Sequence, residues 1–153
     1  MWITGPAGVG KSFLLSALGH AACRRGLRVR YYRLPRLLGE AQVAKQEGRW
    51  LVWLRGLSRW DLLLVDDWGF TTLTLAESQD LFEIVDDRYQ ARGLAIASQV
   101  PIDQWHALFP DPTLAEAILD RLIHGAHRVV IQGESMRKVL SSPTEQDTTN
   151  ITE

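Results

Sequence analysis

The sequence has one cysteine, no long apolar run and almost no net charge. Because Cys23 has no partner in the chain, it cannot form an internal disulfide, and its neighbours Ala21 and Ala22 favour a small packing residue on a helix. No apolar stretch approaches the roughly 20 residues of a membrane span, and the first residues lack the charged-then-apolar pattern of a leader. We therefore expect a cytoplasmic protein without a membrane partner.

The formal net charge of −1 excludes the global positive field that is typical of a dedicated nucleic-acid-binding domain, although it is compatible with a local basic patch. The chain does contain ample apolar material. Of its 153 residues 46% are hydrophobic and 23% are charged, which is sufficient for one globular core. We expect residues 1–140 to form this domain and the mostly polar residues 141–153 to form a disordered tail.

The first motif of the chain is a G-x-x-x-x-G-K-[ST] phosphate-binding loop. Gly8 and Gly10 allow backbone conformations that are closed to residues with a Cβ atom, so that successive N–H groups can turn toward phosphate oxygens. Lys11 is expected to reach the β- and γ-phosphates of ATP, and the Ser12 hydroxyl is expected to bind Mg²⁺. The nucleotide-binding candidates are Gly5, Pro6, Ala7, Gly8, Val9, Gly10, Lys11 and Ser12.

Such a loop requires a buried strand before it and a helix after it. Residues 13–25 predict the helix: they contain no proline, place Leu14, Ala17, Leu18 and Ala21 on one face, and stop at Gly26. Only residues 1–4 are available for the strand, which is shorter than the usual five or six. This shortness suggests a truncated chain or a late start codon.

A second motif consists of two acids, Asp66 and Asp67, directly after the apolar run 62–65. A continuous apolar run is typical of a strand buried on both faces of a parallel sheet, whose carboxyl end is where open α/β sheets bind ligands. Asp66 is then expected to reach Mg²⁺, and Asp67 to orient or deprotonate the attacking water. Acids at a strand end are also common turn formers, and the phosphate loop upstream favours the catalytic interpretation.

The remaining pattern alternates strands and helices. Residues 28–33 predict an edge strand, and 94–97 and 127–132 predict two further strands, with Ser98 at the end of the first of these as a γ-phosphate sensor or a plain strand terminus. Helical stretches are expected at 35–46, 49–59, 75–90, 102–108 and 113–123. This order predicts a mostly parallel five-stranded sheet covered on both faces.

An acid-free basic stretch lies around the predicted edge strand. Arginines that follow phosphates would give sequence-independent, salt-sensitive binding to DNA, and the alternative is a solvated face of the strand and helix. The stretch contains Arg24, Arg25, Arg28, Arg30, Arg33 and Arg36.

Over residues 1–138 the chain resembles the IstB family of AAA+ ATPases, which are helpers encoded beside the transposase of an insertion sequence and are similar to DnaC-type helicase loaders. Beyond the phosphate loop, the resemblance lies in the runs Arg33–Leu38, Asp66–Gly69, Ser98–Gln99, Trp105–His106, Asp111–Ala115, Ile118–Leu122 and Gly133–Lys138.

The resemblance implies a three-layer AAA+ domain that hydrolyses ATP to ADP and phosphate, with Mg²⁺, in active sites between the subunits of a homo-oligomer on DNA. It implies Lys11, Asp66, Asp67 and Ser98 as catalytic residues, although many relatives have Glu in place of Asp67. Arg121 is the implied finger that reaches the neighbouring subunit's site, with an ion pair to Glu116 or Asp120 as the alternative.

Compared with the family pattern, we expect this sequence to lack the helical amino-terminal region and a helical lid after the fifth strand. Arg137 is a candidate for a second phosphate sensor. The leading hypothesis is a helper of transposition that recruits or stimulates a transposase. The alternatives are a loader of the replicative helicase and a non-catalytic remnant that binds nucleotide weakly.

Overall fold

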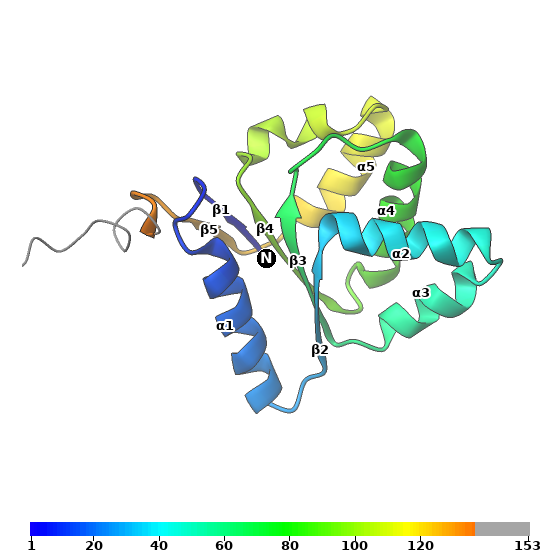
Figure 1. The fold of residues 1–153 in the computed structure, drawn as a ribbon, viewed down its shortest axis with the longest axis horizontal. Coiled ribbons are helices and arrows are strands. Elements are labelled where there is room, and N and C mark those ends of the chain that lie inside the picture. Colours follow the sequence, from blue (N-terminus) through cyan, green and yellow to red (C-terminus); the bar gives the residue numbers. More distant parts are fainter. Residues whose placement is uncertain (137–153) are drawn as a thin grey trace, which may run out of the picture.

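The computed structural model describes residues 1–136, in which five parallel strands form a single sheet (Figure 1). The strands are β1 (Trp2–Thr4), β2 (Val29–Arg33), β3 (Leu62–Trp68), β4 (Gly93–Ser98) and β5 (Arg128–Val130), in the order β2-β3-β4-β1-β5. The helices are α1 (Lys11–Arg24), α2 (Leu34–Gln46), α3 (Trp50–Ser58), α4 (Leu75–Arg88), the 3₁₀ helix η1 (Ile102–Leu108) and α5 (Pro112–Ile123). The predicted parallel sheet and the edge position of β2 are both confirmed.

The sheet separates the helices into two layers. Helix α1 covers one face, and α2 to α5 gather on the other (Figure 1). Successive strand residues alternate between the two: Leu64 and Ala95 belong to the core under α1, whereas Leu63, Val65 and Ile96 belong to the larger core on the other face. The continuous apolar runs of β3 and β4 are thus explained by burial on both faces, and the predicted three-layer architecture is confirmed.

The face by which α1 contacts the sheet differs from the predicted one. The buried positions are Leu15, Gly19 and Ala22, together with Lys11, and not Leu14, Ala17, Leu18 and Ala21. A Cβ atom on Gly19 would lie 2.7 Å from Leu64 Cδ1, so the missing side chain is what lets the helix approach β3. The prediction that Cys23 is a packing residue is also wrong. Its side chain lies on the exposed side of α1, whereas the preceding residue, Ala22, is buried.

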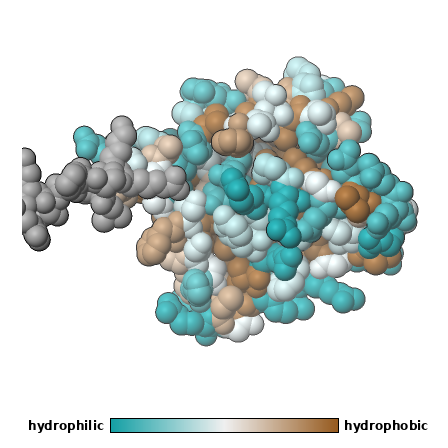
Figure 2. Space-filling view, in the orientation of Figure 1, coloured by the Kyte–Doolittle hydropathy of each residue, from teal (hydrophilic) through white to brown (hydrophobic). Residues whose placement is uncertain are grey.

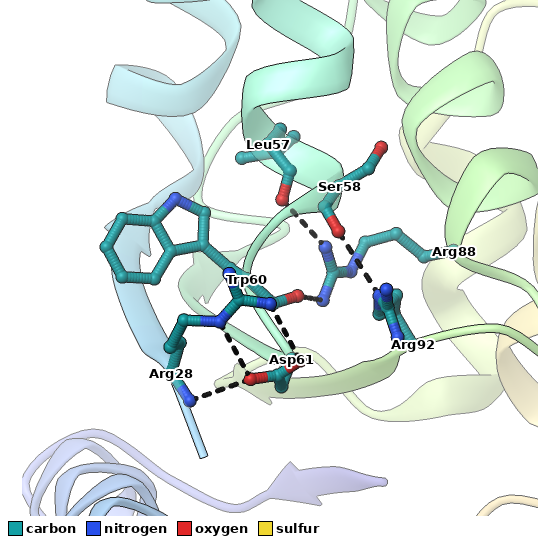
Figure 3. A network of polar contacts seen from close by, with 7 residues as sticks. All are labelled: Arg28, Leu57, Ser58, Trp60, Asp61, Arg88 and Arg92. Atoms are coloured by element: carbon teal, nitrogen blue, oxygen red, sulfur yellow. Dashed lines mark hydrogen bonds and ion pairs between the residues drawn. The ribbon is translucent and has the colours of Figure 1, made fainter. Parts of the chain in front are cut away.

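Arg88 joins α3, α4 and the start of β4 (Figure 3). It is 2% exposed, and its guanidinium donates to the carbonyl oxygens of Leu57 at 3.2 Å and of Trp60 and Gly93 at 2.8 Å. Its neighbour Arg92 donates from Nε to the carbonyl of Ser58 at 3.2 Å. The carbonyl groups at the carboxyl end of a helix lack intrahelical partners, so these two arginines cap α3 and fix it to the rest of the domain.

Among residues 1–136, no helix is both long and apolar enough to cross a membrane. The disordered tail expected at 141–153, the candidate Arg137 and most of the segment where a lid would lie are outside the described residues.

Candidate active site

The phosphate-binding loop follows β1 directly and joins it to α1 at the carboxyl edge of the sheet. Gly8 and Gly10 have φ angles of 80° and 96°, which is the left-handed region expected of both. A Cβ atom on Gly8 would lie 2.2 Å from Ser135 Oγ, and one on Gly5 would lie 2.4 Å from the carbonyl oxygen of Ile131. The loop is therefore packed closely against the segment that follows β5, and glycine is required for this contact as well as for the turn.

Helix α1 presents an uncapped amino terminus to the loop. Gly10 is its N-cap residue, no side chain in the described part of the protein caps it, and its first turn carries no acid. The first N–H groups of a helix have no intrahelical acceptor, and the helix dipole places partial positive charge there. This end of α1, which includes the exposed Ser12, is therefore suited to an anion such as a phosphate.

Lys11 lies within the loop and is buried, being 7% exposed. Its Nζ donates a hydrogen bond to the carbonyl oxygen of Pro6. Burial lowers the pKa of Lys11, and the charges of Asp66 and Asp67 act in the opposite direction. The lysine and the two acids thus share one electrostatic environment, as the sequence predicts for a site at the ends of β1 and β3.

Asp66 and Asp67 are each held by a side chain from β2. The Tyr31 hydroxyl donates to Asp66 Oδ2 at 2.8 Å, and Arg33 Nε donates to Asp67 Oδ2. Asp66 is 5% exposed and also accepts the backbone N–H of Asp67 at 2.8 Å. Burial, followed by the hydrogen bond to Asp66, raises the pKa of Tyr31, so the phenol remains a protonated donor at neutral pH.

Sequence reasoning missed both of these contacts. Tyr31 and Arg33 are two residues apart on β2, so they face the same side of the sheet, and they pair in register with Leu64 and Asp66. Because side chains alternate along a strand, the sequence places Tyr31 and Arg33 on one face of β2 and Tyr32 on the other. This alternation does not reveal the register of β2 with β3. The sequence predicts Arg33 as a DNA contact or as part of a solvated face, and neither interpretation includes an ion pair with Asp67.

Ser98 lies at the end of β4 and is turned into the fold. It is 1% exposed, its Oγ donates to the carbonyl oxygen of Trp68 at 2.6 Å, and it accepts the N–H of Val100 at 3.0 Å. This arrangement favours the plain strand terminus over the phosphate sensor, which stays a prediction. The neighbouring Gln99 is exposed and lines both a cavity of about 740 Å³ with Gly5 and a smaller one with Asp67.

A sequence model of the family described as IstB-like ATP binding protein matches residues 1–143. The chain belongs to this family.

Among its relatives is an insertion sequence ATP-binding protein of Sinorhizobium fredii (strain NBRC 101917 / NGR234). It is 48% identical over 136 residues, which is 89% of this chain and 56% of the relative. The chain therefore spans a little over half the length of this relative.

The structure is similar to AAA+ P-loop proteins. The crystal structure of the DnaC helicase loader has a TM-score of 0.74 at 20% identity, covering 86% of this chain and 77% of that one. The AMPPCP-bound DnaA of Aquifex aeolicus has a TM-score of 0.72 at 24% identity, covering 90% of this chain and 42% of that one. These likenesses show the fold.

In this IstB-like chain Arg121 lies away from the phosphate loop. Its Nε donates to Asp86 Oδ1 of α4 at 2.8 Å, so neither Glu116 nor Asp120 is the ion-pair partner. The guanidinium also stacks over Phe82 at 4.9 Å. Arg121 borders a cavity of about 420 Å³ together with Met1 and Leu94, near the amino ends of β1 and β4. The structure therefore does not bring Arg121 to the site of its own chain.

All six arginines of the basic stretch are exposed. Figure 2 shows hydrophilic residues gathered over β2 and the start of α2, the elements that carry the second half of the stretch. Three of the six pair with acids: Arg28 with Asp61, Arg33 with Asp67, and Arg36 with Glu40. The basic surface is thus partly neutralised within the chain.

Proposed function

We propose that this protein binds ATP with Mg²⁺ at the carboxyl edge of its sheet and hydrolyses it, as a DNA-associated helper of insertion-sequence transposition. The observation that carries the proposal is the phosphate-binding loop with buried Lys11 beside Asp66 and Asp67, at an uncapped helix terminus. Family membership supports ATP binding, and the relative's name associates that relative with an insertion sequence.

The residues of the loop have the roles that their chemistry suits. The N–H groups of Gly5 to Ser12 would hold the phosphate oxygens, and Lys11 would balance their charge. Ser12 and Asp66 would hold Mg²⁺, which supplies charge neutralisation on the phosphates. Asp67 would orient the attacking water, provided that its carboxylate is released from Arg33.

Arg121 would act on the site of a neighbouring copy. Because Arg121 lies away from the loop of its own chain, its guanidinium would reach a transferred phosphoryl group in a neighbouring copy. The pair with Asp86 would then have to open or be shared when copies assemble. Assembly along DNA would be assisted by the basic stretch on β2 and α2, and recruitment or stimulation of a transposase would follow from the assembled state.

A loader of the replicative helicase is the second candidate, favoured by the similarity to DnaC over 77% of that chain. The two functions differ in partner. Capture of a transposase supports the first, and capture of a replicative helicase supports the second. A non-catalytic remnant is the third, and it predicts that hydrolysis is absent whatever partner is added.

The test is ATP hydrolysis with and without double-stranded DNA by the wild type, Lys11→Ala and Arg121→Ala. We expect Lys11→Ala to lose both nucleotide binding and hydrolysis, and Arg121→Ala to lose hydrolysis alone. When the two inactive variants are mixed in equal amounts, about a quarter of the interfaces combine an intact loop with an intact Arg121, so activity should return. No recovery on mixing contradicts the intermolecular role, and hydrolysis by Lys11→Ala contradicts the assignment of the site.

A further inference from the structure

The cavity of about 420 Å³ that Arg121 borders lies near the amino ends of β1 and β4, at the edge of the sheet opposite the phosphate loop. Its charged lining side chains are all cationic, and the imidazole of His124 lines it as well. These cations are Arg88, Arg92 and Arg121. No acidic side chain of residues 1–136 lines the cavity, and the rest of its wall includes apolar side chains from α4, β4 and α5. The cavity therefore offers positive charge beside an apolar surface.

Two of the three arginines keep an uncompensated charge. Arg121 pairs with Asp86, whereas neither Arg88 nor Arg92 forms an ion pair within residues 1–136. The two terminal nitrogens of Arg88 donate to three backbone carbonyl groups, and Arg92 donates from Nε to the carbonyl of Ser58 (Figure 3). A neutral carbonyl satisfies a donor without cancelling its charge. The cavity is thus lined by two guanidinium charges that no carboxylate of the described chain binds.

These two uncompensated charges also act on each other. Burial lowers the pKa of Arg88, Asp87 opposes this effect, and the charge of Arg92 adds to it. Of the acids nearby, Asp61 pairs with Arg28, and neither Asp61 nor Asp87 lines the cavity. An anion bound in the cavity would relieve the repulsion between the two arginines.

We propose that this cavity binds a small organic phosphate. Arg92 and His124 would hold the phosphate group, Arg88 would contribute its buried charge, and the organic part would lie against the apolar wall. The volume of about 420 Å³ falls within the usual range of about 300–1,000 Å³ for small-molecule sites. Because the cavity is separate from the phosphate loop, binding there requires neither ATP nor its hydrolysis.

Charge decides between a phosphate and a carboxylate as the anion. A phosphate monoester carries about −1.5 to −2 charges at pH 7, whereas a carboxylate carries a single one. The phosphate therefore matches the two uncompensated guanidinium charges of Arg88 and Arg92. Arg92 is exposed, and its two terminal nitrogens form no hydrogen bond within residues 1–136. They are thus available for the paired contacts that arginine makes with phosphate.

The test is isothermal titration calorimetry with phenyl phosphate, a phosphate monoester whose organic part is an apolar ring. All titrations use a Lys11→Ala background, in which the phosphate loop lacks its lysine. We expect Arg92→Gln to weaken binding about tenfold or more, because a hydrogen bond from a charged donor is lost. The control is Arg55→Gln, since Arg55 is an exposed arginine of α3 that does not line the cavity, and this change should leave the affinity unchanged. Equal affinities of these two variants, or no binding before either change, would overturn the proposal.

A second variant at the same position separates binding from folding. Arg92→Lys keeps the charge without the paired donors, so it should weaken binding less than Arg92→Gln does. Urea unfolding of both variants shows whether they fold alike. If they are equally stable and bind phenyl phosphate equally weakly, the charge of Arg92 does not hold the ligand and the proposal fails.

Two further probes separate the parts of the ligand. Inorganic phosphate lacks the ring and should bind about tenfold or more weakly than phenyl phosphate, because the apolar wall stays uncovered. Benzoate keeps the ring but carries a single charge, and it should also bind about fivefold or more weakly. Inorganic phosphate that binds as tightly as phenyl phosphate would contradict the organic part of the ligand. Benzoate that does so would contradict the choice of phosphate over carboxylate.

Discussion

The guanidinium of Arg88 offers the sharpest test of how this domain is held together. The change is Arg88→Met, which keeps the apolar stem of the side chain and removes its charged donors. Leu57 retains a hydrogen bond from the N–H of Trp60, so the carbonyl groups of Trp60 and Gly93 are the ones that lose a charged donor at 2.8 Å. Arg92→Ala is the matched control, because Arg92 is exposed and its side chain makes one hydrogen bond within the described residues, to the carbonyl of Ser58.

The magnitude follows from these contacts. Hydrogen bonds from a charged donor contribute about 1.5–3 kcal/mol each, which gives about 3–6 kcal/mol for two. Burial lowers the pKa of Arg88, which reflects the desolvation of the cation that the variant recovers. Burying the cation costs several kcal/mol, and the variant no longer bears this cost, which offsets part of the lost hydrogen bonding. We therefore expect a net destabilisation of about 2–3 kcal/mol. Arg92→Ala should cost less than about 1 kcal/mol.

The assay is urea unfolding followed by tryptophan fluorescence and by circular dichroism. Arg88→Met should lower the midpoint while leaving the slope unchanged, since the same surface is exposed on unfolding. A destabilisation no larger than that of Arg92→Ala would refute the argument. It would mean that the desolvation of Arg88 cancels its hydrogen bonds and that α3 is held by apolar packing alone.

Four further predictions follow from local geometry. Gly19→Ala should destabilise the protein by about 1–2 kcal/mol, because its Cβ would lie 2.7 Å from Leu64 Cδ1. Gly39→Ala, in open space on α2, should instead stabilise it by about 0.5–1 kcal/mol in the same unfolding assay. The hydrogen bond from Arg28 lowers the pKa of Asp61 from 3.8 to about 2, so the pair stabilises the fold above pH 3.8 and this contribution is lost as pH falls toward 2. Asp61→Asn should therefore flatten the acid limb of the stability profile between these values, and an unchanged limb contradicts the pair. Gly8→Ala should weaken binding of a fluorescent ATP analogue about tenfold or more, because it adds a Cβ at φ 80° and 2.2 Å from Ser135 Oγ. Equal binding by the variant and the wild type would show that the loop can move away from Ser135.

The order of elements could be predicted because each signal is local. Glycine spacing defines the phosphate loop, an apolar run defines β3, and proline and glycine mark the helix ends, so the strands and helices occur where the pattern places them. The edge position of β2 also followed from its alternation of charged and apolar residues. These features depend on neighbours within a few residues along the chain.

Which face of a helix is buried, and which residues of two strands meet, could not be predicted in the same way. On α1 the buried stripe passes through Gly19, a residue that contributes no hydrophobicity, and the more apolar Leu14 is left partly exposed. The reason is the close approach to Leu64, which depends on the third dimension. The contact of Tyr31 with Asp66 likewise depends on the register between β2 and β3, and register is not encoded in either strand alone.

Strand β1 has consequences for how the domain opens. With three residues it lies between β4 and β5, and within residues 1–136 β5 pairs with β1 and with no other strand. The amide protons of β5 should therefore exchange with solvent through a local separation of β5 from β1. The free energy of this opening should be lower than that of the openings that expose the amides of β3 and β4. Because β1 continues directly into the phosphate loop, a ligand that holds the loop in place also holds β1 against β5. Slower amide exchange in β5 would then report on ligand binding at the loop.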